Sequence, residues 1–296
     1  MSAATELDNV PEVPIERTRR KRAWLTAFRT PAGVIGLVLM VIVVVLAALS
    51  LFGLTADPAH QNVAESLKPP SGAHWFGTDQ FGRDIFARVA SGLANSLRIS
   101  IVSVAVAAVA GTVLGVLGGY YQGIVDRLVG IITNVLFAFP SLLLALALAA
   151  TLERSWVTVS ISIAIVYLPI FARVARGPVL TLRTADYVLA STAIGRSRLS
   201  TLFEHIIPNM RGILVVQITL SLSWAILTEA SLSFLGFGTP PPAASLGGMV
   251  YDAQTLSSVA PWMLLFPGAA LIVAVIGLNL LGDSLRAALD PRTEGR

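Results

Sequence analysis

The stretch GVIGLVLMVIVVVLAALSLFGL, residues 33–54, contains no charged side chain and indicates the fold class of this protein. A helix needs about 20 mostly apolar residues to cross a hydrocarbon layer about 30 Å thick. Five further windows of this kind follow along the 296-residue chain, and the expected spans cover residues 32–54, 97–120, 127–150, 156–173, 212–237 and 262–282. The sequence therefore predicts an all-α, polytopic membrane protein with six transmembrane helices.

The composition agrees with a membrane protein and excludes several other classes. Hydrophobic residues make up 55% of the chain and charged residues 13%, whereas soluble domains carry about 25% charged residues. The formal net charge is +4, but most basic residues lie between the apolar windows and form no continuous basic face, so we expect no nucleic-acid partner. Because the chain has no cysteine, it has neither disulfides nor a cysteine nucleophile.

The distribution of Lys and Arg predicts which side of the membrane each connection occupies. Most of them lie in the N-terminal segment, between residues 173 and 211, and at the C-terminus, and cytoplasmic segments keep such an excess. We therefore expect both termini in the cytoplasm. The expected divisions are a cytoplasmic N-terminal tail at 1–30, a first transmembrane helix at 31–54, an extracytoplasmic loop at 55–95, a five-helix core at 96–283 with a cytoplasmic loop at 174–211, and a cytoplasmic C-terminal tail at 284–296.

Glycines and prolines within the windows predict how the helices pack. Gly111, Gly115 and Gly119 recur at a four-residue spacing, which predicts one helix face without side chains, suited to close packing. Pro140 lies within the third window and is expected to kink that helix, because proline lacks the backbone N–H that an uninterrupted helix uses.

A search for catalytic and metal-ligating residues is negative. The three histidines, His60, His74 and His205, lie outside the expected spans, and no HExxH or GxSxG pattern occurs. The two lysines, Lys21 and Lys68, do not follow a glycine-rich loop, so this chain cannot form the phosphate cradle of a P-loop. We expect no catalytic residue, no metal site and no bound cofactor. The chain is predicted not to be an enzyme, and energy for active transport would come from elsewhere.

Glu229 is the one charged residue inside an expected span rather than at its end. A charge at the centre of a bilayer costs about 2.5 to 3.5 kcal/mol on insertion scales. One interpretation is a hydrogen-bonded structural carboxylate near the external end of the fifth span, which we favour. The other is a proton relay or a substrate contact.

The loop at 174–211 contains two short helical patterns. Residues 186–194 predict one helix, Gly195 suits a left-handed C-terminal cap, residues 199–207 predict a second helix, and Pro208 is expected to stop it. Helices this short are marginal in water on their own. Either the loop folds back under its own bundle, or it docks into a partner.

Four segments together resemble the membrane-spanning subunits of binding-protein-dependent ABC importers, in the dipeptide/oligopeptide/nickel branch of the DppC/OppC type. Residues 187–195, YVLASTAIG, followed by IIPN at 206–209, are similar to the EAA loop of that family, with Leu189 where Glu is usual and Ser191 where the second Ala is usual. The other three segments are HWFGTDQFGRD at 74–84, similar to GTDxxGRD, EASLSFLGFG at 229–238, similar to EAxLSFLGxG, and LGDSLRAALDPR at 281–292, similar to LGDxLRDxLDPR.

The resemblance implies a type I ABC importer permease fold in the bacterial inner membrane. It implies a second permease subunit of the DppB/OppB type, two cytoplasmic ATPase subunits that hold ATP and Mg, an extracytoplasmic solute-binding protein, and contact with membrane lipid. The substrate would be a short peptide, or alternatively nickel, glutathione or another small solute. An ion-coupled secondary transporter that works alone, with Glu229 as the coupling group, and a non-transporting scaffold are the alternatives from other classes.

Two sets of residues follow from the resemblance. The ATPase-coupling loop would comprise Asp186, Tyr187, Val188, Ala190, Ala193, Gly195, Ile207 and Pro208. The external signature segment would comprise Gly77, Thr78, Asp79, Gly82, Arg83 and Asp84. Its Asp and Arg side chains are expected to form a local ion-pair and capping network at the start of the second span, and the alternative is direct contact with the binding protein.

Overall fold

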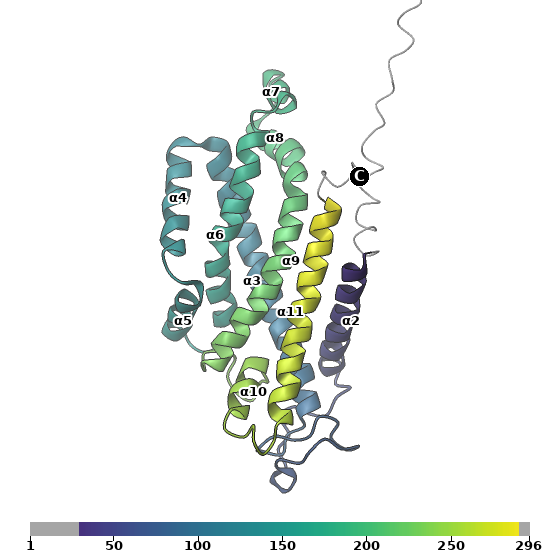
Figure 1. Ribbon diagram of the computed structural model, residues 1–296. Coiled ribbons are helices and arrows are strands. Elements are labelled where there is room, and N and C mark those ends of the chain that lie inside the picture. Colours follow the sequence, from purple (N-terminus) through teal and green to yellow (C-terminus); the bar gives the residue numbers. More distant parts are fainter. Residues whose placement is uncertain (1–29, 290–296) are drawn as a thin grey trace, which may run out of the picture.

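A computed structural model describes residues 30–289, and these form an elongated bundle of helices (Figure 1). The helices are α2 (Pro31–Leu51), α3 (Ile85–Tyr121), α4 (Gly123–Phe137), α5 (Ser141–Thr151), α6 (Trp156–Leu182), α7 (Asp186–Ala193), α8 (Arg198–Thr201), α9 (Ile207–Phe234), α10 (Leu246–Ala253) and α11 (Trp262–Leu289). Short 3-10 and π turns lie at Val63–Glu65 and Leu202–Ile206. Between residues 30 and 289 no β-strand forms, which agrees with the predicted all-α class.

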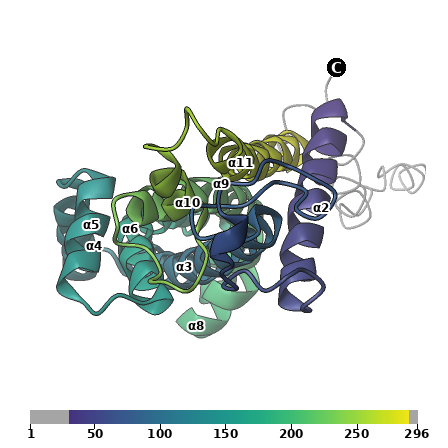
Figure 2. The same ribbon diagram turned by 90° about the horizontal axis from the view of Figure 1, so that it is seen from below.

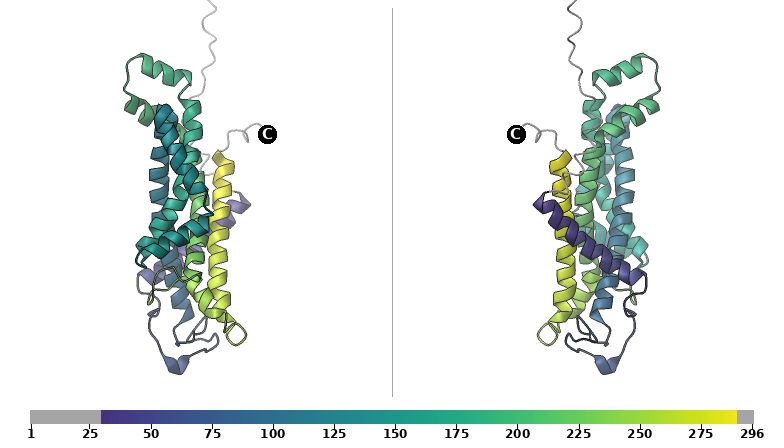
Figure 3. Two further views of the ribbon diagram at one scale, coloured as in Figure 1. Left: turned by 90° about the vertical axis from the view of Figure 1, so that its left-hand side faces the viewer. Right: turned by 90° about the vertical axis from the view of Figure 1, so that its right-hand side faces the viewer.

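Five helices, α2, α3, α6, α9 and α11, are long and apolar enough to cross a membrane, and the bent α4–α5 pair would make a sixth. The α3, α6, α9 and α11 helices run roughly along the bundle axis, whereas α2 crosses them obliquely at one edge and α4 and α5 lie at the other edge (Figures 2 and 3). The expected tail at 1–30 lies outside the described residues except for its last residue, as do residues 290–296 of the expected C-terminal tail.

The α3 helix passes through the centre of the bundle and packs closely along α6. A side chain at Gly111 would overlap the Leu168 carbonyl oxygen, and one at Gly115 would overlap the Ala172 carbonyl oxygen. At Gly119 a side chain would meet Val179. The close-packing face predicted from the glycine spacing is therefore confirmed, with α6 as its partner.

The helix that contains the second predicted span begins within the segment that was expected to be an external loop. We expected an external loop to residue 95 and a span from residue 97, but α3 begins at Ile85, directly after Asp84. The Asp84 carboxylate accepts a hydrogen bond from the backbone N–H of Ala87 at 2.8 Å, which caps the helix. The charged residues at 83–88 suggested a solvated loop. Arg88 is instead buried and paired with Asp79, so it is compatible with a packed helix.

The third predicted span, 127–150, is two helices rather than one. The α4 helix ends at Phe137, α5 begins at Ser141, and the two axes meet at 90°. Pro140 occupies the N-cap position of α5 and disfavours a helical conformation for the residue before it, so the predicted kink is a complete break.

The remaining helices also differ from the expected spans in their ends. The α6 helix continues to Leu182 rather than 173, α9 covers Ile207–Phe234 rather than 212–237, and α11 continues to Leu289, so the expected C-terminal tail at 284 is helical over its first six residues. The second short helix, predicted at 199–207 and expected to stop at Pro208, does not end there. The α8 helix, the π turn and α9 run on as one helix over Arg198–Phe234, and Pro208 lies inside it. Proline is tolerated there because it lies just after the π turn, where the α-helical hydrogen-bond pattern is already interrupted.

Candidate functional site

Asp79 organises the external signature segment. Its Oδ2 lies 2.6 Å from Arg83 Nε and 3.6 Å from Arg88 Nε. Its Oδ1 accepts hydrogen bonds from the backbone N–H groups of Phe81 and Arg83, at 2.8 and 3.0 Å. All three charged side chains are largely buried, and a buried ion pair is tolerated only where further hydrogen bonds satisfy it. Asp79 therefore stabilises the turn over residues 79–83 and neutralises a buried arginine in α3.

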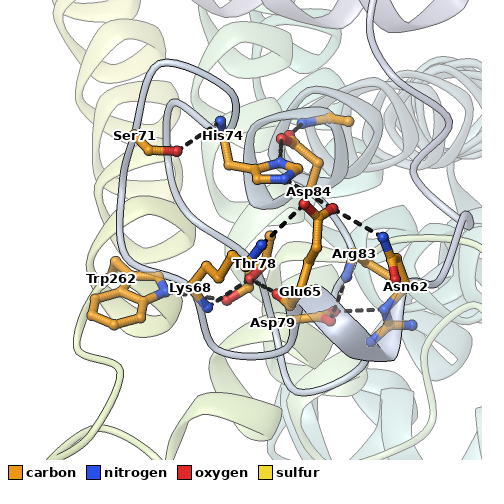
Figure 4. Close-up of polar contacts among 11 residues, drawn as sticks. Asn62, Glu65, Lys68, Ser71, His74, Thr78, Asp79, Arg83, Asp84 and Trp262 are labelled. Atoms are coloured by element: carbon orange, nitrogen blue, oxygen red, sulfur yellow. Dashed lines mark hydrogen bonds and ion pairs between the residues drawn. The ribbon is translucent and has the colours of Figure 1, made fainter.

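Asp84 connects the start of α3 to the external loop through His74 (Figure 4). His74 Nδ1 lies 2.8 Å from Asp84 Oδ2, and its Nε2 lies 3.3 Å from Glu65 Oε2. The hydrogen bond to Asp84 has the largest effect and raises the pKa of His74. Partial burial lowers this pKa, and the hydrogen bond to Glu65 raises it further. Hydrogen bonding to Lys68, and then to His74, lowers the pKa of Glu65. Together with Asp79, these contacts make the ion-pair and capping network that the segment predicts.

Thr78 joins the signature segment to the last helix. The backbone carbonyl of Thr78 accepts a hydrogen bond of 3.1 Å from Trp262 Nε1, at the start of α11. Gly77 and Gly82 adopt positive φ angles of 77° and 71°. At Gly82 a side chain would also overlap the carbonyl group of Asn62, so the turn requires glycine there. All six residues of the predicted segment therefore lie in one small folded unit.

Glu229 lies fully buried in α9, five residues before that helix ends. This end of α9 lies at the end of the bundle that carries the signature segment (Figure 1). Ser96 Oγ in α3 donates to Glu229 Oε2 at 2.6 Å, and Ser233 Oγ donates to Oε1 at 2.7 Å. The carboxylate thus joins α9 to α3. This environment agrees with the hydrogen-bonded interpretation, because an enclosed side chain cannot contact a substrate without a rearrangement.

The predicted helix at 186–194 is present as α7 and projects beyond the ends of the long helices (Figures 1 and 3). Gly195 follows it with a φ of 83°, and its N–H donates to the Thr192 carbonyl at 3.0 Å. The left-handed cap predicted at this position is therefore confirmed. Of the predicted coupling residues, Asp186, Tyr187, Val188, Ala190 and Ala193 lie in α7, Gly195 in the following turn, and Ile207 and Pro208 at the start of α9.

The loop packs against its own bundle on one side and exposes apolar residues on the other. Val188 in α7 is buried, and Leu202 and Ile206 join an apolar cluster with α3, α6 and α9. The exposed apolar residues of α7, α8 and the turns beside them are Tyr187, Leu189, Ile194, Leu199 and Phe203. We call these five residues the apolar foot. Arg196 forms an ion pair with Glu204 beside it.

Sequence reasoning missed several contacts between distant segments. Arg176 in α6 forms a bidentate ion pair with Asp126 in α4, and Ser96 was not recognised as the partner of Glu229. The lone Asp126 between two apolar windows was a signal for the first pair. No local pattern distinguishes Ser96 from the other serines of α3.

Comparisons with known proteins give relatives over most of the chain. Residues 111–295 match the family described as "Binding-protein-dependent transport system inner membrane component". The dipeptide transport system permease protein DppC of Alkalihalophilus pseudofirmus is 39% identical over 273 residues, which cover 91% of this chain and 90% of that protein. The glutathione transport system permease protein GsiD of Pectobacterium atrosepticum is 43% identical over 223 residues, 75% of this chain and 74% of that protein.

A solved structure has the same fold. The crystal structure of an amino acid ABC transporter with histidines matches 68% of this chain and 94% of its own chain, with a TM-score of 0.53. The sequences are 16% identical, so the likeness concerns the fold alone. The expected type I importer permease architecture agrees with this match.

Proposed function

The chain belongs to the binding-protein-dependent transport system inner membrane components, and on this premise we propose that it forms the membrane-spanning part of an ATP-driven importer of short peptides. The dipeptide permease relative matches along about nine-tenths of both chains, which supports a peptide substrate. The five long apolar helices and the bent α4–α5 pair supply the membrane-crossing structure that such a subunit needs.

The proposed assembly contains subunits that supply what this chain lacks. These are a second permease of the DppB/OppB type, two cytoplasmic ATPases that hold ATP and Mg, and an extracytoplasmic solute-binding protein. The sequence has no P-loop lysine, so ATP hydrolysis belongs to the ATPases and this chain is not itself an enzyme. Membrane lipid would cover the outer apolar faces of the helices.

The projecting α7 helix is the observation that carries the coupling proposal. Its apolar foot has Leu189 52% exposed and Ile194 77% exposed, while Val188 anchors the helix to the bundle. Exposed apolar residues on a helix held in place in this way suit a groove on an ATPase subunit. ATP favours the closed ATPase pair, and a rigidly docked helix would pass that preference to the membrane-spanning helices. Leu189 stands where the EAA loop of the family usually has Glu, so this contact would be apolar instead of charged.

The arrangement of the two ends of the bundle supports the proposed orientation. The foot, the start of α2 and the end of α11 lie toward one end, and α10 with the signature segment lies at the other (Figure 1). The basic residues concentrate near the foot and the two termini. We therefore propose that both termini and the foot face the cytoplasm, and that the signature segment faces the binding protein.

Glutathione is the second candidate substrate, because the glutathione permease relative has a higher identity over a shorter segment. The experiment is uptake into vesicles that contain the complete assembly, with labelled dipeptides, tripeptides, glutathione and nickel supplied separately. ATP-dependent uptake of dipeptides or tripeptides is expected. Exclusive uptake of glutathione or nickel would change the substrate, and uptake driven by a proton gradient without the ATPases would contradict the proposed class.

A further inference from the structure

A cavity of about 340 Å³ opens between the α4–α5 break, α6 and α9. The residues that matter for its chemistry are Phe139, Ser141, Tyr167, Gln217, Ser221 and Trp224. Phe139 and Ser141 lie at the break between α4 and α5. Tyr167 lies near the middle of α6, and Gln217, Ser221 and Trp224 lie near the middle of α9. The cavity therefore lies at middle depth along the bundle. The α4–α5 pair that lines one side of it lies at the edge of the bundle opposite α2 (Figure 2).

The helix break beside the cavity is unfavourable in lipid. Residues 138–140 separate α4 from α5, so the last carbonyl groups of α4 lack the donors that a further helical turn would supply. Non-helical backbone at membrane depth is tolerated only where protein buries it or where it lines a water-filled cavity. Phe139 and Ser141, on either side of Pro140, both line this cavity.

The lining is polar in part but carries no charged side chain. Gln217 Nε2 donates to Ser221 Oγ at 3.1 Å, which leaves the amide oxygen of Gln217 able to accept a further hydrogen bond. The Tyr167 hydroxyl lies 3.2 Å from Thr228 Oγ1. No Asp, Glu, Lys or Arg is among the lining residues. A membrane-spanning surface with an amide and hydroxyl groups is costly against lipid tails.

We infer that this cavity is the part of the substrate path that this subunit contributes, and that it takes the uncharged main chain of a short peptide together with an apolar side chain. The amide and hydroxyl groups match peptide N–H and C=O groups, and Phe139 and Trp224 offer apolar contact. Ligand sites commonly enclose about 300 to 1,000 Å³, so the volume suffices for part of a short peptide. A transport path must release the substrate that it binds. A lining without charged side chains binds a peptide more weakly than a charged lining would, so it suits passage. This inference rests on the proposed function.

The test uses the natural lack of cysteine in this chain. Ser141→Cys and Gln217→Cys are each introduced into the complete assembly in vesicles and treated with a charged, membrane-impermeant methanethiosulfonate reagent applied to both sides. The matched control is Val41→Cys, at a half-exposed position in the middle of α2 on the opposite edge of the bundle. Labelling of the two cavity positions but not of residue 41 is expected. A peptide that the wild-type assembly imports should slow labelling at both cavity positions.

Each contrary result has its own meaning. Absence of labelling at both cavity positions, in variants that still import peptide, would show that the partner subunit fills the cavity and would overturn the inference. Labelling that the imported peptide does not slow would also overturn it, because the cavity would then hold water but lie off the path. Loss of peptide uptake by the wild-type assembly would instead reject the proposed function, so the two failures are distinguishable.

Discussion

Arg176 and Asp126 form a bidentate ion pair that connects α6 to α4, with Nε to Oδ1 at 2.5 Å and Nη2 to Oδ2 at 2.7 Å. The arginine side chain is 41% exposed and the carboxylate 24% exposed, so solvent screens the pair. The pair lies between α6, which leads into the loop that carries the foot, and α4, the first half of the broken α4–α5 unit. It is therefore a direct link between these two parts of the bundle.

Asp126→Asn is expected to lower the free energy of unfolding by no more than about 1 kcal/mol, because the pair is partly exposed. Thermal unfolding of the detergent-solubilised protein at low and high salt would measure this, and the difference from wild type should shrink at high salt. The control is Glu153→Gln, whose side chain makes no ion pair within the described residues. An equal effect of both substitutions would argue against a specific role of the pair.

Asp79→Ala should be far more damaging, because it leaves Arg83 and Arg88 buried without their carboxylate. Removal of one partner of a buried ion pair typically costs about 3 to 5 kcal/mol. Faster proteolysis of the external segment and poor assembly are the expected results. Glu65→Gln, which removes partly exposed contacts with Lys68 and His74, is the control and should leave protease resistance and assembly close to those of wild type. Wild-type protease resistance in Asp79→Ala would contradict this account.

Gly195→Val should impair coupling while leaving membrane insertion intact. The position has a φ of 83° and open space around it, so the cost comes from the backbone and not from a clash. A left-handed conformation costs about 1 to 2 kcal/mol for residues other than glycine. Peptide uptake and co-purification of the ATPases should both fall. Gly195→Asn is the matched variant and should be milder, because asparagine tolerates this conformation; equal loss in both variants would point away from backbone strain.

Glu229→Gln should be mild and Glu229→Leu severe. Glutamine retains oxygen and nitrogen atoms that can bond Ser96 and Ser233, whereas leucine leaves two buried hydroxyl groups without this partner. An unsatisfied buried group costs about 1 to 3 kcal/mol. Assembly yield and transport rate of each variant provide the measurement. Loss of transport in a fully assembled Glu229→Gln complex would assign the carboxylate a functional role.

The external loop should become less stable as the pH rises, because of His74. The pKa of His74 is raised above 6.5 in the folded state, chiefly by hydrogen bonding to Asp84. Its stabilising contribution is therefore fully present below about pH 6.5 and is lost as the pH rises through the higher, folded-state pKa. Protease sensitivity of the 55–84 segment between pH 5 and pH 9 would measure this. His74→Gln should flatten the profile, and an unchanged profile would exclude this residue as the cause.

The features predicted correctly depend on local properties of the chain. Charge-free windows locate the membrane helices because the hydrocarbon layer excludes charged side chains, whichever helices pack against one another. Gly195 and the glycines of α3 were also interpreted correctly, since a left-handed cap and a side-chain-free helix face follow from residue type and spacing. Pro208 was interpreted wrongly, because a proline can lie inside a continuous helix where a π turn interrupts the α-helical hydrogen-bond pattern.

The sequence by itself therefore determined the class of protein, the number of apolar segments and the short helix before Gly195. Tertiary structure alone decided which charges are buried, where α3 begins and how sharply α4 turns into α5. Arg88 belongs inside because Asp79 lies beside it, and Ser96 bonds Glu229 across 133 residues of chain. The physical reason is that local patterns fix the conformation of a segment, whereas the environment of a polar group depends on which distant segment packs against it.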